Sequence, residues 1–261
     1  PEAPGRSVQN VPVAVADTVG VHRHLRGDAG RIPSDCADPC RGPCCGGGML
    51  PVPSAACPAA RPEAGVHPVD AHGLAQWYDV EVFSEKWWEL AERYVRFGAE
   101  HGINMLLTPL FTPPLDTLEG GERLTVQLVE VRLKRSALEG GSGPVWEFGY
   151  EKLDRWIAMC ERCGIRYLEA SHLFTQWGAK AAPKIMAVKN GEYVQIFGWD
   201  TDAAGGAYRT FLHQFLTALK KELADMGISQ KCYFHISDEP SMDHLESYRK
   251  AWEAVAPDLE G

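Results

Sequence analysis

The residues best placed to do chemistry are two adjacent carboxylates, Asp238 and Glu239, which follow a short apolar run in KCYFHISDEP (231–240). The run is rich in β-branched and aromatic residues and too short for a helix, so it predicts a buried strand at 232–236. In α/β folds the ligand site lies at the carboxyl ends of the strands. The acid pair is therefore the first candidate for catalysis. Because successive residues of an extended chain point to opposite sides, its two members should have different roles.

The same two acids also have a purely structural interpretation. Asp238 can cap the helix that is predicted from Ser241 onward, while Glu239 stays in solvent. Pro240 lacks a backbone N–H and favours an extended residue before it, which helps the strand to end here. Composition alone leaves the catalytic and the structural interpretations open.

Charge and length narrow the class of protein. A formal net charge of −9 over 261 residues argues against nucleic-acid or anionic-membrane binding as the main task. No run approaches the roughly 18 apolar residues of a membrane span. With 45% hydrophobic residues the chain can bury a large core and form one α/β domain. The sequence does not decide between a cytoplasmic and an exported protein.

Composition divides the chain near residue 76. Residues 1–76 contain no Phe, Trp, Tyr or Lys and are rich in Pro and Gly, which predicts a low-complexity, disordered segment. An alternative hypothesis is an out-of-frame reading of GC-rich DNA, motivated by Arg without Lys; an intact reading frame through residue 76 would exclude it. The segment also carries cysteines that could form a zinc or disulfide cluster, although their spacing fits structural zinc sites only loosely: Cys36, Cys40, Cys44, Cys45 and Cys57.

From Trp77 onward, helical and strand patterns alternate. Buried strands are predicted at 103–107, 165–169 and 232–236, and helices at 84–100, 150–163, 208–226 and 241–255. Residues 124–148 alternate apolar and polar around a Gly-rich turn and predict an inserted β-hairpin. This order is typical of parallel crossover units, in a doubly wound sheet or a (β/α)₈ barrel. No G-x-G-x-x-G follows a strand, so a nucleotide-binding sheet lacks its fingerprint.

Polar and aromatic residues gather in the predicted loops. Glu169, His172, Thr175, Gln176 and Trp177 stand where the second strand opens into a long loop, and FGWDTD (197–202) holds a further Trp. Such mixtures are typical of carbohydrate-binding surfaces, although a lone Trp is more often a core residue. The Pro-rich loop at 108–116 suits a cleft wall or a stiff connection equally. The pair Cys160 and Cys163 is predicted to be structural, because a redox motif belongs at a helix N-terminus.

Four stretches carry a family resemblance: HGINMLLTPLFTPPLDT, SHLFTQWGAKAAPKI, FGWDTD and HISDEP. They resemble the catalytic domain of glycoside hydrolase family 123, known for β-N-acetylgalactosaminidase activity, and the resemblance covers residues 77–261. It implies a partial (β/α)₈ barrel, roughly its first half, with the acid pair at the end of the fourth strand. Three strands are visible, so the first is expected ahead of Trp77.

The resemblance also implies residue roles. Glu239 corresponds to the general acid/base, and Asp238 to the residue that orients the substrate's own 2-acetamido group. The carbonyl oxygen of that group attacks the anomeric carbon, so the configuration is retained without a protein nucleophile, a metal or a cofactor. The implied substrate is a β-linked N-acetylhexosamine, with N-acetylgalactosamine favoured. Further substrate contacts are expected from Asp116, His172, Trp177, Trp199 and His235.

Two alternatives remain at this stage. A conventional retaining glycosidase would place a nucleophile on a later strand, beyond Gly261, but its acid/base Glu usually follows an Asn, and here Asp238 stands in that position. A non-catalytic carbohydrate-binding barrel would keep the aromatic cleft without turnover. Substrate scope separates them, because 2-hydroxy glycosides cannot assist their own cleavage.

Overall fold

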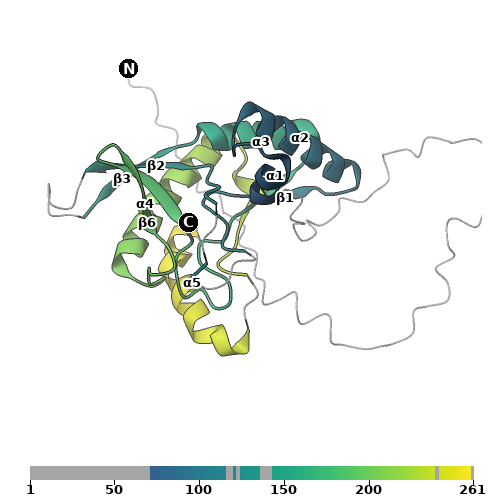
Figure 1. The fold of residues 1–261 in the computed structure, drawn as a ribbon. Coiled ribbons are helices and arrows are strands. Elements are labelled where there is room, and N and C mark those ends of the chain that lie inside the picture. The colour runs from purple at the N-terminus through teal and green to yellow at the C-terminus, as the bar shows by residue number, and fades with distance from the viewer. Residues whose placement is uncertain (1–70, 116–119, 122–123, 136–142, 239–240, 260–261) are drawn as a thin grey trace, which may run out of the picture. The chain divides into compact units, whose positions relative to one another are not determined.

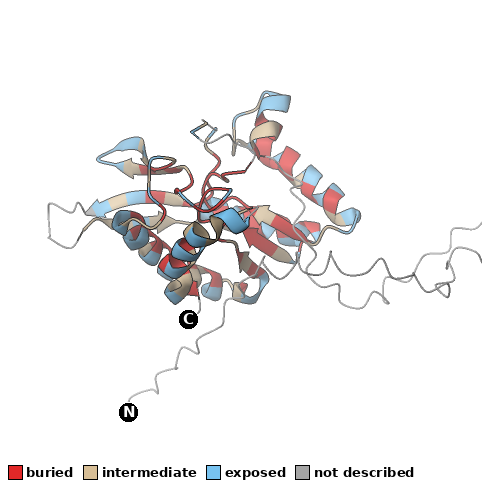
Figure 2. Ribbon diagram, turned by 90° about the horizontal axis from the view of Figure 1, so that it is seen from below, coloured by how far each residue is buried: buried red, intermediate tan, exposed pale blue. Residues whose placement is uncertain are grey.

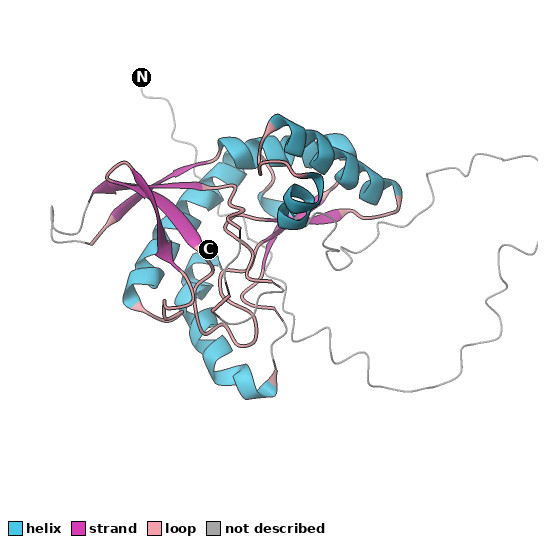
Figure 3. Ribbon diagram, viewed as in Figure 1, coloured by secondary structure: helices cyan, strands magenta, loops and turns pink. Residues whose placement is uncertain are grey.

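A computed structural model describes residues 71–115, 120–121, 124–135, 143–238 and 241–259 (Figure 1). These residues form a mixed α/β arrangement with one three-stranded parallel sheet and one four-stranded mixed sheet (Figure 3). No closed barrel is present among them. The cysteines of the N-terminal segment lie outside the described residues. No described helix is both long and apolar enough to cross a bilayer.

The parallel sheet confirms the three predicted strands and their order along the chain. It runs β1-β4-β7, with β1 at Met105–Thr108, β4 at Tyr167–Ala170 and β7 at Cys232–Phe234. Leu107 pairs with Glu169, and Glu169 pairs with Tyr233, so these three side chains share one face of the sheet. Sequence neighbours are also neighbours in the sheet, as crossover connections require.

The described part of the chain contains five α-helices, and four of them follow the predicted pattern. Ser84 caps α2 by accepting a hydrogen bond from the Trp87 backbone N–H at 3.2 Å. Gly102 and Gly164 end α2 and α3 with φ of 94° and 92°, which a side chain would strain. The helices are α1 (Ala71–Tyr78), α2 (Glu85–Glu100), α3 (Glu151–Cys163), α4 (Gly206–Asp225) and α5 (Leu245–Leu259), with short 3₁₀ turns at Ser229–Lys231 and Met242–His244.

The helix that sequence analysis did not predict is α1, which runs across residue 76. Ala71, Leu74 and Ala75 on this helix are buried, whereas Trp77 is 85% exposed. The indole N–H of Trp87 on α2 also donates to the Ala71 carbonyl at 3.2 Å. Contacts with α2 therefore hold α1, since a helix this short is marginal alone.

The mixed sheet has the order β3-β2-β5-β6 and contains two hairpins. Strands β2 (Glu130–Arg135) and β3 (Val145–Gly149) confirm the predicted hairpin, although most of its Gly-rich turn lies outside the described residues. Sequence analysis missed the second hairpin, formed by β5 (Ile185–Lys189) and β6 (Glu192–Phe197). Its turn is Asn190-Gly191 with φ of 54° and 85°, a strong local hairpin signal.

The core is dense in aromatic rings, and Figure 2 shows that burial extends from the helices into the central loops. Tyr208, Phe211 and Phe215 on α4 stack in sequence, with ring centroids 6.2 Å apart. Cys160, Cys163 and Cys232 are buried free thiols, as predicted for structural cysteines. Burial raises the pKa of the Cys232 thiol to about 12, so it is protonated at neutral pH.

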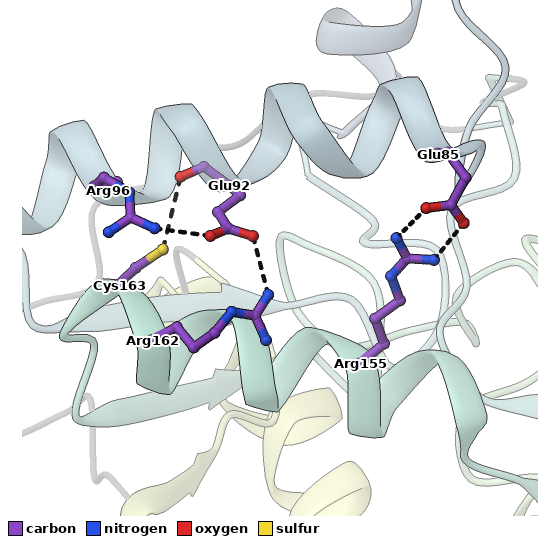
Figure 4. Close-up of polar contacts among 6 residues, drawn as sticks. All are labelled: Glu85, Glu92, Arg96, Arg155, Arg162 and Cys163. Atoms are coloured by element: carbon purple, nitrogen blue, oxygen red, sulfur yellow. Dashed lines mark hydrogen bonds and ion pairs between the residues drawn. The ribbon is translucent and has the colours of Figure 1, made fainter.

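Ion pairs join α2 and α3 along their exposed sides (Figure 4). Arg155 donates two hydrogen bonds to Glu85, at 2.7 and 2.6 Å. Glu92 accepts one from Arg96 at 2.7 Å and one from Arg162 at 2.9 Å. These charges are solvent-exposed, so they contribute little to the stability that the buried core provides.

Candidate active site at the carboxyl edge of the parallel sheet

The segment that leaves β4 is unusually buried for a loop. Every residue from 168 to 176 is buried, although loops normally run over the surface. Glu169 at the end of β4 and four polar side chains of this segment must find partners inside the protein; the four are Ser171, His172, Thr175 and Gln176.

This buried segment lies alongside the segment that leaves β7, the predicted site of the acid pair. Backbone N–H groups of the first donate to carbonyls of the second at three places: Leu173 to His235 (3.3 Å), Phe174 to Ile236 (3.1 Å) and Trp177 to Asp238 (3.2 Å). The hydroxyl of Ser237 returns a hydrogen bond to the Thr175 carbonyl at 2.7 Å. The two strand ends are therefore held together, and side chains far apart in sequence meet at one edge.

Asp238 lies at this edge, as predicted, and is half-buried. Its Oδ2 accepts a hydrogen bond from Nε2 of the buried Gln176 at 3.0 Å. The following 3₁₀ turn begins at Met242 with Ser241 as its N-cap, so the carboxylate bonds to the neighbouring loop instead of capping that turn. Asp238 is thus oriented by a fixed amide donor from the adjacent strand end.

Beside Asp238 a second group of polar side chains comes together. Glu169 Oε1 lies 3.2 Å from His235 Nε2, and the rings of His172 and His235 are 5.3 Å apart. Burial, assisted by the negative charge of Asp238, raises the pKa of Glu169 to about 7. Burial lowers the pKa of His235, while Asp238 opposes that effect. At neutral pH this edge therefore holds a neutral imidazole and a carboxyl group near its titration point.

The two predicted tryptophans occupy different places. Trp177 adjoins Asp238 through its backbone N–H, adopts φ of 54° and is 40% exposed. Trp199 is half-buried, and its indole N–H donates to the Gly121 carbonyl at 3.1 Å. It lines a cavity of about 240 Å³ together with Pro113 and Pro114 of the Pro-rich loop. That loop does form a wall of a cavity.

The structure brings together three of the predicted site residues, His172, His235 and Asp238, with the backbone of Trp177 beside them. Trp199 belongs to the neighbouring cavity, which Thr175 also lines. Glu239 and Asp116 lie outside the described residues, so their positions are not part of this geometry.

Glu169 and Gln176 were not selected from the sequence as site residues. Glu169 ends the second predicted strand, and Gln176 stands in the polar loop after it. One signal was available for Glu169: like Asp238, it is a carboxylate at the carboxyl end of a predicted buried strand. Gln176 had no comparable signal, since its importance follows from its contact with Asp238, 62 residues away.

Comparison with known proteins identifies the kind of enzyme to which this edge belongs. A search of curated proteins gives no match. The family model described as glycoside hydrolase 123, catalytic domain, matches residues 69–260, a range that contains β1, β4, β7 and the whole carboxyl edge. Because this match covers most of the chain, the protein belongs to glycoside hydrolase family 123.

Proposed function

We propose that this glycoside hydrolase cleaves β-linked N-acetylhexosamine, with N-acetylgalactosamine favoured, by a retaining mechanism in which the substrate supplies the nucleophile. Asp238 orients the 2-acetamido group and Glu239 protonates the glycosidic oxygen. The acetamido oxygen attacks the anomeric carbon, and the aglycone leaves with the proton from Glu239. Glu239 then takes a proton from water, which opens the cyclic intermediate.

The observation that carries this proposal is the setting of Asp238. Gln176 donates to one of its oxygens at 3.0 Å and thereby restrains the rotation of the carboxylate. A carboxylate fixed in this way can accept a hydrogen bond from the acetamido N–H and stabilise the positive charge that develops there. Half-burial strengthens that electrostatic interaction relative to an exposed site.

The polar groups around Asp238 suit a sugar ligand. His172 and His235 lie at the same edge and can exchange hydrogen bonds with hydroxyl groups. Trp177, whose backbone N–H donates to the Asp238 carbonyl, is 40% exposed, and aromatic faces pack on the apolar faces of sugars. Asp116 and Trp199 are proposed as further contacts, and Trp199 lines the cavity that the Pro-rich loop also lines.

The fold to which the parallel sheet belongs is also part of the proposal. We propose that β1, β4 and β7 are consecutive strands of a (β/α)₈ barrel, because they are parallel, adjacent in chain order and linked by helices. The acid pair then follows the last of the three. Residues 77–261 are proposed as the barrel half and residues 1–76 as a low-complexity segment, of which residues 71–76 are the start of α1.

Substrate scope tests the proposal. The protein, expressed with all the coding sequence that its locus provides, is assayed with three aryl glycosides: β-N-acetylgalactosaminide, β-N-acetylglucosaminide and β-galactoside. We expect cleavage of an acetamido sugar and none of the galactoside, which lacks the assisting group. Cleavage of the galactoside would overturn the mechanism in favour of a protein nucleophile. Sugar binding without any hydrolysis would indicate a binding module instead.

A further inference from the structure

Three side chains of the kinds that bind metal ions lie close together at the carboxyl edge. The proposed mechanism does not use a metal ion. Glu169, His172 and His235 each offer one ligand atom, and these atoms all lie within 4.8 Å of one another. Glu169 and His172 are buried, at 7% and 4% exposure. We propose that these three residues bind one divalent transition-metal ion, with Zn²⁺ as the best match.

The backbone holds the three residues in place before any ion binds. Glu169 is fixed in β4 by its pairing with Tyr233 of β7. His235 follows β7 directly, and its carbonyl accepts the Leu173 N–H, the residue next to His172. Both histidines are therefore tied to the same two strand ends as Glu169, so little ordering is needed for the ligands to converge.

The spacing suits a tetrahedral ion. Ligand atoms about 2.0–2.1 Å from a tetrahedral Zn²⁺ lie roughly 3.3–3.5 Å from one another. The pair Glu169 Oε1 and His235 Nε2 already stands at 3.2 Å. The 4.8 Å limit on the other separations leaves a contraction of at most about 1.5 Å, which side-chain rotation can supply.

A second observation points to a cation at this position. Glu169 Oε2 is buried and accepts no hydrogen bond from any residue that the structure describes. A buried carboxylate oxygen without a partner is unfavourable in its ionised form, because the charge has lost its water without gaining a compensating contact. A metal ion among the three residues would give the Glu169 carboxylate a full positive charge beside it, including a partner for Oε2, which has no hydrogen bond among the described residues.

The donor set selects the class of ion. Two imidazole nitrogens and one carboxylate oxygen form the ligand set of many three-residue zinc sites, which keep a fourth position open. Mg²⁺ and Ca²⁺ prefer oxygen ligands throughout and bind such a set poorly. The proposal is independent of glycoside hydrolysis, because it concerns the binding of an ion by the protein without substrate.

The N-terminal cysteines could bind Zn²⁺ as well, so the test removes them from consideration. Cys36, Cys40, Cys44, Cys45 and Cys57 are changed to Ser in the full chain, and the protein is stripped with EDTA. Isothermal titration with Zn²⁺ should give one site per chain, and Mg²⁺ should not compete for it. Cobalt substitution should give a spectrum of nitrogen and oxygen ligands without thiolate bands.

Variants of two of the three ligands, in the same background, test the site. Glu169→Gln and His235→Gln should each weaken Zn²⁺ binding by at least about 100-fold. His213→Gln is the matched control, because His213 pairs with Asp258 at 2.6 Å on the exposed side of α4 and lies outside the cluster. It should leave the affinity unchanged. Equal Zn²⁺ affinity in all variants would overturn the proposal.

A measurement on the unsubstituted cluster covers the case in which a ligand variant fails to fold. Zn²⁺ should raise the melting temperature of the chain that lacks the five N-terminal cysteines, in proportion to the logarithm of the Zn²⁺ concentration. X-ray absorption of the zinc-loaded chain should show two imidazoles in the first coordination sphere. Absence of both signals would exclude the site, whatever the outcome of the glycosidase assay.

Discussion

The α2–α3 surface and the carboxyl edge both place carboxylates beside nitrogen cations or imidazoles, yet the carboxylates behave in opposite ways. On the helix surface, hydrogen bonds from Arg155 lower the pKa of Glu85 (Figure 4). At the edge, burial raises the pKa of Glu169 to about 7 although His235 lies 3.2 Å away. The exposed Glu85 carboxylate has both oxygens bonded by Arg155, whereas Oε2 of the buried Glu169 has no hydrogen-bond partner among the described residues. Incomplete pairing in a buried place is the better indicator of function.

Removing the charge of Asp238 should have the largest effect. In Asp238→Asn the side chain keeps its shape but no longer stabilises positive charge on the acetamido nitrogen, so we expect kcat to fall at least about 100-fold. Glu92→Gln on the helix surface is the control and should retain full activity. Steady-state kinetics on an aryl N-acetylhexosaminide measures both. Comparable rates for the two variants would show that Asp238 at the carboxyl edge matters no more for catalysis than Glu92 on the helix surface.

Loss of the amide that orients Asp238 should have a smaller effect. Gln176→Ala removes the 3.0 Å hydrogen bond and should lower kcat about tenfold with little change in KM, because substrate contacts remain. Gln214→Ala is the matched control. The side-chain amide of Gln214 bonds the backbone of Trp146 in β3 and of Pro144 just before it, not the carboxyl edge of the parallel sheet. If Gln176→Ala alters KM alone, Gln176 contacts substrate instead of positioning Asp238.

The buried carboxyl should leave a signature in stability against pH. The ordinary pKa of Glu169 is 4.5 and its folded value is about 7, so the folded chain holds a proton that the unfolded chain releases. Stability from this group is complete below pH 4.5 and is lost as pH rises through about 7, up to about 3 kcal/mol in total. Urea unfolding in EDTA should show that loss in the wild type and not in Glu169→Gln.

Glu169 is faced by His235, His172 and Asp238. Of these, His235 has a pH dependence of stability opposite to that of Glu169. The lowered pKa of His235 gives stability that is present above its ordinary value of 6.5 and lost as pH falls. The contribution of Glu169 is therefore read as the difference between wild type and Glu169→Gln between pH 4.5 and 6. Parallel curves over that interval would show that the carboxyl is not shifted.

The smallest effect is expected on the helix surface. Glu85→Gln removes the bidentate pair with Arg155, but both groups are open to solvent. We expect a melting temperature within experimental error of the wild type at neutral pH and physiological salt. A clear loss of stability would mean that the α2–α3 ion pairs stabilise the fold. The exposed pairs would then not be the energetically minor contacts that the comparison with the buried edge assumes.

Local sequence signals predicted most of the elements. Ser84 and Gly102 delimit α2 through capping geometry that depends on a few neighbouring residues, and the three parallel strands follow from short apolar runs. The turn at Asn190-Gly191 is an equally local signal, so the second hairpin, which sequence analysis missed, was also predictable from neighbouring residues.

The candidate site was harder to predict from the sequence than the helices and strands. Asp238, His172 and His235 could be selected one at a time from their places after strands. Their meeting with Glu169 and Gln176 depends on the pairing of β4 with β7 and on the backbone bonds from Leu173 and Phe174, all across about 60 residues. Burial of a loop is likewise a tertiary property, so the shifted pKa of Glu169 could not be inferred from its neighbours in the chain.

The buried thiols make the opening of this fold measurable. Only the thiolate is alkylated, and burial holds Cys160, Cys163 and Cys232 in the protonated form. Cys232 sits on β7 and Cys163 on the last turn of α3. Alkylation followed peptide by peptide would therefore time the exposure of the strand that leads to Asp238 separately from the fraying of a helix end.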